Sequence, residues 1–196
     1  VETGLKNITD VYMNTLDYHA ERADLYLYEM LNNSQECAVL ERKDSASWEY
    51  ENAKYQCYNK LAKQMEQEDV VSGYFLIPKR SGDCILTLDS SLVNIPEIRT
   101  YITSVRECDN QWHIVKMGTQ SVLIRVASEK NFYYGAMINL TAQQREIENL
   151  SNYSDQNVWF GENETEAGKE RIQASSRSRR MEVVLSIDVS RKECYQ

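Results

Sequence analysis

The spacing of apolar residues changes once along this chain, and that change restricts the possible folds more than any other feature. Before Asp69, apolar side chains recur every three or four positions, which is typical of amphipathic helices. After Asp69 the period becomes two, and short apolar segments are separated by turn residues, which is typical of strands. A helical beginning followed by a strand-rich remainder predicts an α+β fold, in which helices cover one face of an antiparallel sheet.

The first predicted helix is unusually long. Its apolar stripe consists of Leu5, Ile8, Tyr12, Leu16, His19, Ala23, Leu27 and Met30. Gly4 precedes the stripe, no later glycine or proline interrupts it, and the residues from Asn32 to Ser34 form a stop signal. A helix of about 30 residues exceeds the usual length in globular proteins, so we expect it to serve as a spine of the fold.

A second helix is expected to return along the first as an antiparallel hairpin. Asp44 and Ser45 are the N-cap candidates, because their side chains can accept hydrogen bonds from the first free N–H groups of a helix. The buried stripe of this helix consists of Tyr50, Ala53, Cys57, Leu61 and Met65. Residues 1–69 are therefore assigned to the long helix and the return helix.

Residues 70–150 are expected to contain five strands and one helical insertion. The strand segments are VVSGYFLIP, GDCILTLD, QWHIVKM, SVLIRVAS and NFYYGAMINL. The insertion follows the second strand and has Pro96 near the start of its helix. The last three strands are joined by connectors of hairpin length, so we expect their sheet to be antiparallel.

Residues 151–196 repeat this pattern in a shortened form. QNVWFGE and MEVVLSIDVS predict two strands, and the polar segment between them predicts a loop with a short helix. Two strands are too few for an independently stable sheet. We therefore expect this segment to pack against the central module or the first helix.

The composition excludes several classes of protein. The chain is 42% hydrophobic with only two prolines, which is typical of a globular protein. Its net charge of -8 argues against a nucleic-acid partner, because phosphate binding requires clustered lysine and arginine. No run of about 18 apolar residues is present, so no segment is predicted to span a bilayer. Because the sequence starts at Val1 rather than methionine, we interpret it as an excised or processed piece.

Neither a catalytic site nor a cofactor or metal site is predicted. The sequence has no nucleophile elbow, HExxH motif, Walker-type loop or GxGxxG motif. Its two histidines, His19 and His113, have no third ligand at metal-binding spacing. We therefore expect that this segment is not an enzyme.

The cysteines leave two interpretations open. They are Cys37, Cys57, Cys84, Cys108 and Cys194. They include no CxxC pair, and their odd number argues against a fully paired disulfide framework. One interpretation is that they are buried free thiols, which pack as small hydrophobic residues. The other is that Cys37 and Cys57 close the turn between two helices in an oxidising compartment.

The order of predicted elements resembles the Cache group of PAS-like extracellular sensors, as found in Gram-positive membrane sensor histidine kinases. The residues that carry the resemblance are SGYFLIPKRSGDCILTLDSS, QWHIVKM, SVLIRVAS and NFYYGAMINL, and the closing VVLSIDVSRKE is similar to a membrane-proximal end. The resemblance covers most of the chain. It implies a membrane-distal PAS-like module at residues 70–150. It also implies a second PAS-like module at residues 151–196 that is reduced relative to the usual two-module form.

The resemblance also implies that a ligand lies between the sheet and the loops and helix that cover it. Within SVLIRVAS, the alternation of side chains places Arg125 on the opposite face from Ile124 and Val126. Arg125 is predicted to bind a carboxylate of the ligand, because a guanidinium group can donate two parallel hydrogen bonds. The alternative is that this face is solvated or that Arg125 pairs with a surface acid.

The segment NFYYGAMINL supplies further candidates for the ligand site. Gly135 in the middle of a strand indicates close approach by a backbone, a bulge or a ligand. Tyr133 and Met137 flank it on the same face and are predicted to form the pocket floor, with Trp112 and Tyr101 as its roof. Plain cross-strand packing is the alternative explanation.

Together these features predict the extracytoplasmic ligand-sensing domain of a transmembrane receptor, of the kind found in sensor histidine kinases of two-component systems. A small solute would bind the PAS-like pocket and favour one of two packings of the long helix. Flanking segments outside this chain are expected to enter the membrane, and a parallel homodimer is expected through the stripe of the first helix. The alternative is a secreted or surface-anchored protein-interaction domain without a small ligand.

Overall fold

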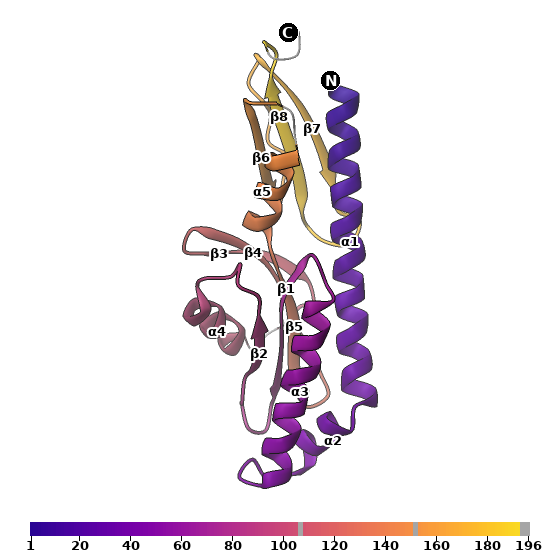
Figure 1. Ribbon diagram of the computed structural model, residues 1–196, viewed down its shortest axis with the longest axis vertical. Coiled ribbons are helices and arrows are strands. Elements are labelled where there is room, and N and C mark those ends of the chain that lie inside the picture. The colour runs from indigo at the N-terminus through magenta and orange to yellow at the C-terminus, as the bar shows by residue number, and fades with distance from the viewer. Residues whose placement is uncertain (106–107, 151–152, 193–196) are drawn as a thin grey trace. The chain divides into compact units, whose positions relative to one another are not determined.

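The computed structural model describes residues 1–105, 108–150 and 153–192, and it confirms the α+β class (Figure 1). The helices are α1 (Glu2–Asn33), α2 (Gln35–Arg42), α3 (Trp48–Glu66), α4 (Ile95–Ser104) and α5 (Leu140–Leu150). The strands are β1 (Val71–Pro78), β2 (Ile85–Leu88), β3 (Trp112–Met117), β4 (Gln120–Glu129), β5 (Phe132–Asn139), β6 (Gln156–Gly161), β7 (Arg171–Arg177) and β8 (Val184–Ser190). Within these ranges, none of the helices combines the length and the apolar character that a bilayer span requires.

These elements pack as two compact units. The larger unit contains residues 19–139, and the smaller unit contains residues 1–18 together with the chain from residue 140 onward. The boundaries differ from those expected at residues 69 and 150, because α1 supplies a packing surface to both units. That the segments 1–69, 70–150 and 151–196 act as separate modules stays a prediction.

The larger unit is built on a five-stranded antiparallel sheet with the strand order β2-β1-β5-β4-β3. All five strands that the sequence predicted are present, and α4 follows β2 with Pro96 in its first turn. The central strands β1, β5 and β4 are buried along most of their length, because helices cover both faces of the sheet in this unit. The central strands therefore lie in the interior of the larger unit.

The helical hairpin differs in detail from the prediction. The unpredicted helix α2 begins after Ser34, whose hydroxyl accepts a hydrogen bond from the Cys37 N–H. Ser47 caps α3 by accepting from the Tyr50 N–H, so the N-cap prediction at Asp44 and Ser45 was wrong. Asp44 instead accepts from a backbone N–H in the turn before the cap. Sequence patterns locate helix ends poorly because several adjacent polar residues can serve as caps.

Helix α3 runs antiparallel to the second half of α1 within the larger unit (Figure 1). His19 Nδ1 lies 3.0 Å from Oε2 of Glu68, a residue just after the end of α3. The Tyr26 hydroxyl donates to the Lys60 carbonyl oxygen. Earlier residues of α1 thus meet later residues of α3, as the predicted hairpin requires. This contact also places His19 at the seam between the two helices.

The smaller unit contains a three-stranded antiparallel sheet with the order β6-β8-β7. Strands β6 and β8 were predicted, but the segment assigned to a loop and short helix forms β7. Lys6 Nζ donates to the Ser175 carbonyl oxygen at 2.7 Å, and Asp17 accepts from the Ser178 hydroxyl and the Arg179 N–H. The sequence of β7 is rich in serine and arginine and shows no clear apolar alternation. The reason is that this strand contacts the first turns of α1 through polar groups rather than apolar ones.

Candidate functional site

The five-stranded sheet presents faces with different partners. One face packs against α4, and its core consists of Phe75, Ile77, Leu92, Ile98, Ile102, Met117, Val122, Ile124, Val126 and Met137. The other face packs against α1 and α3, where the rings of Tyr26 and Tyr74 lie 5.7 Å apart. Because successive side chains of a strand point to opposite sides, each strand supplies residues to both faces.

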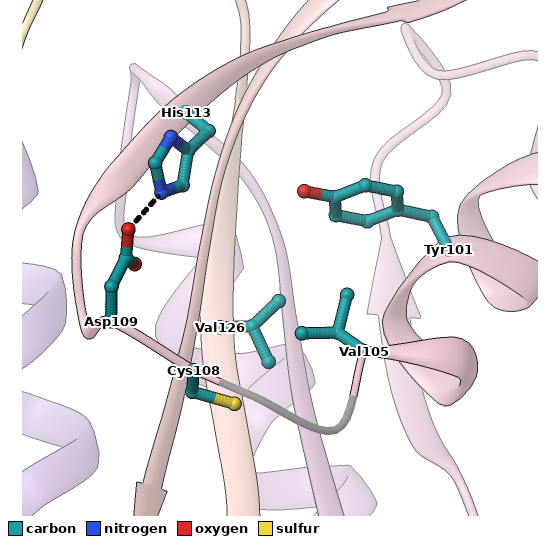
Figure 2. Close-up of a pocket in the computed structure, with 6 residues that line it drawn as sticks. All are labelled: Tyr101, Val105, Cys108, Asp109, His113 and Val126. Atoms are coloured by element: carbon teal, nitrogen blue, oxygen red, sulfur yellow. Dashed lines mark hydrogen bonds and ion pairs between the residues drawn. The ribbon is translucent and has the colours of Figure 1, made fainter.

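A cavity of about 720 Å³ lies on the α4 face, beside the edge strand β3 (Figure 2). Its lining residues are Tyr101, Val105, Cys108, Asp109, His113 and Val126. Helix α4, the connection that follows it, β3 and β4 all contribute side chains. Figure 2 shows Val105 and Val126 pointing toward one another, with the Tyr101 hydroxyl directed from α4 toward the strands. The volume lies in the usual range for small-molecule sites.

Asp109 and His113 form the polar side of this cavity. His113 Nε2 lies 2.7 Å from Asp109 Oδ2, and the Gln111 N–H donates to Asp109 Oδ1 at 2.9 Å. The backbone hydrogen bond from Gln111, together with the His113 contact, lowers the pKa of Asp109, so its carboxylate is charged at neutral pH. A charged carboxylate and an imidazole therefore face the cavity together.

The remaining lining groups are neutral. Burial raises the pKa of the Tyr101 hydroxyl and of the Cys108 thiol, so both stay protonated at neutral pH. Val105 and Val126 supply the apolar wall. Across the described ranges of the chain, no group of three or more His, Cys, Asp and Glu side chains is arranged to hold a metal ion. The cavity thus suits an organic molecule with an apolar part and a polar end.

Three of the five predicted site residues lie on the cavity face. Tyr101 lines the cavity itself. Met137 is fully buried in the hydrophobic core of that face, and Tyr133 packs against the same core while the Lys79 ammonium lies 4.9 Å from its ring centroid. Tyr133 and Met137 therefore match the packing alternative, since neither is among the lining residues.

Arg125 and Trp112 lie on the opposite face of the sheet, where both meet α1. Arg125 Nη1 lies 3.3 Å from Asp24 Oδ1, and Trp112 Nε1 donates to Asp24 Oδ2 at 3.3 Å. The Arg125 guanidinium also lies over the ring of Tyr134, and its Nε donates to the Asn110 carbonyl oxygen. Arg125 thus pairs with an acid of this chain, which is the alternative that the sequence left open.

Gly135 has the close backbone contact that its position in the strand indicated. A Cβ atom at this position would overlap the carbonyl oxygen of Arg125 on β4 and would lie 2.7 Å from the ring of Phe75. Phe75 is the β1 residue directly opposite Gly135, so its ring covers the glycine across the strands. The close approach comes from the protein itself rather than from a ligand.

Sequence reasoning missed five of the six lining residues. They are Val105, Cys108, Asp109, His113 and Val126. A usable signal was present in the alternation, because His113 pairs with Ile124 and so shares the face of Val126. The sequence contains no comparable signal for Val105, Cys108 and Asp109, which follow α4. Apolar spacing does not predict the conformation of such a connection.

Comparisons with known proteins support the same architecture. No protein-family model matches this sequence, and no curated protein matches it. The extracellular domain of vpHK1S-Z8, a protein assigned as a histidine kinase, matches 100% of this chain and 95% of its own length, with a TM-score of 0.57 and 10% identity. The fold is that of extracellular sensory domains.

This sensory-domain fold also matches structures of the Campylobacter jejuni chemoreceptor Tlp3. Its sensory domain covers 100% of this chain and 95% of its own length, with a TM-score of 0.53 and 9% identity. The same domain with isoleucine bound, and the ligand-binding domain in complex with L-valine, each match with a TM-score of 0.50 and 11% identity. The resemblance inferred from the sequence is thus confirmed at the level of the fold.

Proposed function

We propose that this chain is the extracytoplasmic sensor domain of a membrane signal-transduction receptor, and that a small solute binds in the cavity lined by Tyr101 and Asp109. The observation that carries the proposal is the cavity itself, on the α4 face of a sheet whose fold is that of sensory domains. In this proposal segments outside the chain anchor it to the membrane, and a histidine kinase is the favoured effector. The domain itself needs no catalytic group.

The cavity recognises its ligand through Asp109, His113 and the Tyr101 hydroxyl, while Val105 and Val126 contact its apolar part. A ligand ammonium or hydroxyl group would suit the Asp109 carboxylate, which the Gln111 N–H keeps charged. Arg125 lends no support to a carboxylate-bearing ligand, because it lies on the other face of the sheet. The amino acids bound by Tlp3 fit the general size of such a solute.

The signal passes from the cavity to α1 through Arg125. The residue after Asp109 is Asn110, whose carbonyl oxygen accepts from Arg125 Nε at 3.0 Å. The same guanidinium pairs with Asp24 on α1, so one side chain joins the cavity loop to the helix. A ligand that moves Asp109 changes this linkage, and it can shift the packing of α1 only by its difference in affinity for the two arrangements.

A ligand screen by thermal unfolding tests the cavity. Amino acids, amines, organic acids and sugars are compared, and a true ligand at 100 times its Kd should stabilise the domain by about 2.7 kcal/mol. Tyr101→Ala and Asp109→Asn should each remove most of this stabilisation, because they remove a wall and the charged group of the cavity. Tyr55→Ala is the matched control, since Tyr55 lies exposed on α3.

Two results would contradict the assignment. If the two cavity variants keep the full stabilisation, the ligand binds elsewhere. If no compound of any class raises the unfolding temperature of the wild-type domain, the alternative of a protein-interaction domain without a small ligand is favoured. The exposed aromatic residues Trp48, Tyr55 and Tyr58 on α3 would then be the first surface to study.

The homodimer is proposed through a different stripe from the one that the sequence indicated. Leu5, Leu16 and Leu27 of the predicted stripe are buried within the fold and are not available to a second chain. Exposed apolar residues follow another line along α1 with heptad spacing. They are Val11, Tyr18, Leu25 and Tyr28, which are 52% to 62% exposed. This spacing suits a parallel two-stranded seam between two copies of α1.

Sedimentation velocity across a concentration series tests this dimer. Wild-type protein should shift toward the dimer as its concentration rises, and Leu25→Glu should stay monomeric because a charge at a central seam position is not tolerated. Val93→Glu replaces an equally exposed apolar residue away from α1 and should behave as wild type. Identical sedimentation of Leu25→Glu and wild type would exclude the α1 seam.

A further inference from the structure

Two buried cysteines lie together where α2 packs against α3. Cys37 is in the first turn of α2 and Cys57 is in the middle of α3. Both are free cysteines, and each residue is at most 1% exposed. The two helices pack against each other, and the two side chains interact electrostatically within this contact. Two interacting thiols buried between packed helices are placed to form a covalent bond across the helix pair.

The surroundings make the two thiols chemically unequal. Cys37 lies in the first turn of α2 after the N-cap Ser34, so it is at the positive end of the α2 dipole, and its interaction with the Ser34 side chain also favours the thiolate. The interaction with the Cys57 side chain lowers the pKa of Cys37, while that interaction and burial raise the pKa of Cys57. Cys37 is therefore the more acidic of the two thiols in the packed helices.

We propose that Cys37 and Cys57 form a disulfide that fastens α2 to α3 in the mature domain. The Cys37 thiolate attacks one sulfur of an oxidant disulfide and forms a mixed disulfide with it, while the other sulfur of the oxidant leaves as a thiolate. The Cys57 thiolate then displaces the second half of the oxidant. The net change oxidises two protein thiols to a disulfide and reduces one oxidant disulfide to two thiols, which take up the two protons that the protein thiols lose.

The setting of this reaction rests on the proposed function, because an extracytoplasmic domain meets the oxidising conditions under which disulfides persist. Both sulfur atoms are inaccessible in the packed helices. The exchange therefore takes place while α2 and α3 are still assembling. Once closed, the bond lies in the hydrophobic interior and resists reduction from solvent.

Peptide mapping of the whole domain after refolding in a buffer of reduced and oxidised glutathione tests the proposal without any ligand. Trypsin should release residues 23–42 and residues 55–60, each with a single cysteine, because Arg22, Arg42, Lys54 and Lys60 bound them. The wild type should give these two peptides linked, with a mass 2 Da below their sum. Recovery of both as separate alkylated peptides after oxidising refolding would overturn the proposal.

Thermal unfolding gives a second measurement. Reduction of the wild type should lower its Tm by about 6 to 12 °C, because the bond closes a loop of about 20 residues in the unfolded chain. Cys57→Ser should make the Tm insensitive to reductant, whereas the control Cys84→Ser should keep the full shift. Linkage of Cys37 to any cysteine other than Cys57 would also overturn the proposal. Neither measurement depends on the cavity, so failure here leaves the ligand test unaffected.

Discussion

Gly135→Ala should destabilise the larger unit by about 3 kcal/mol, measured as the free energy of unfolding in urea. The added methyl group would overlap the carbonyl oxygen of Arg125, which belongs to the backbone of the neighbouring strand. It would also meet the ring of Phe75, which is fully buried and has no space to move into. The overlap can be relieved only if β4 and β5 move apart. Both are interior strands of the five-stranded sheet, so their separation disturbs the pairing on which the sheet depends.

Gly168→Ala is the control for this substitution. No atom of the protein would lie within 4 Å of its added methyl group, so we expect a change within about 0.5 kcal/mol. A loss for Gly135→Ala as small as that for Gly168→Ala would show that the two strands can separate at little cost. The description of Gly135 as a close-approach position would then be wrong.

Arg125→Ala should reduce the free energy of unfolding by about 2 to 3 kcal/mol. The side chains of Arg125 and Asp24 are only 14% and 33% exposed, so removal of the guanidinium takes away an ion pair that is largely shielded from water. The substitution also removes the hydrogen bond to the Asn110 carbonyl oxygen and the contact with Tyr134. Urea unfolding of the domain without ligand measures the loss.

Lys43→Ala provides the matched control, because it breaks an ion pair with Glu49 whose two side chains are 51% and 52% exposed. Such surface pairs contribute little, so its effect should stay below about 1 kcal/mol. The combination of Arg125→Ala with Asp24→Asn should show a coupling energy of about 1 to 3 kcal/mol. Additive effects would mean that the pair does not act as a unit, and the proposed route from the cavity to α1 would lose its central link.

Much of the fold followed from apolar periodicity because buried faces impose it directly. The long stripe of α1 and the five strands of the larger sheet were all predicted from this signal. Strand β7 was missed because its contacts with α1 are polar: the Ser175 carbonyl oxygen accepts from Lys6 and the Ser176 hydroxyl donates to Thr9, so no apolar pattern marks the strand. Helix α2 was missed because eight residues are too few to show a helical period clearly.

The candidate site was harder to predict because it depends on how a loop closes over the sheet. Tyr101 was found because it belongs to a helix with a clear pattern. Asp109 lies in a connection whose path no periodicity determines. Arg125 was informative as the only charged residue within its strand segment, but its partner Asp24 is about 100 positions away and could not be identified without the fold.

Strand β4 places a wall of the cavity and the contact with α1 within one peptide unit of each other. Val126 lines the cavity, and its neighbour Arg125 contacts α1 on the opposite face of the sheet. A rotation of β4 about its own axis would therefore move both side chains together. No extended chain of intermediate residues is required. In a receptor built this way, substitutions that disturb signalling without weakening ligand capture should cluster on the odd-numbered residues of this strand.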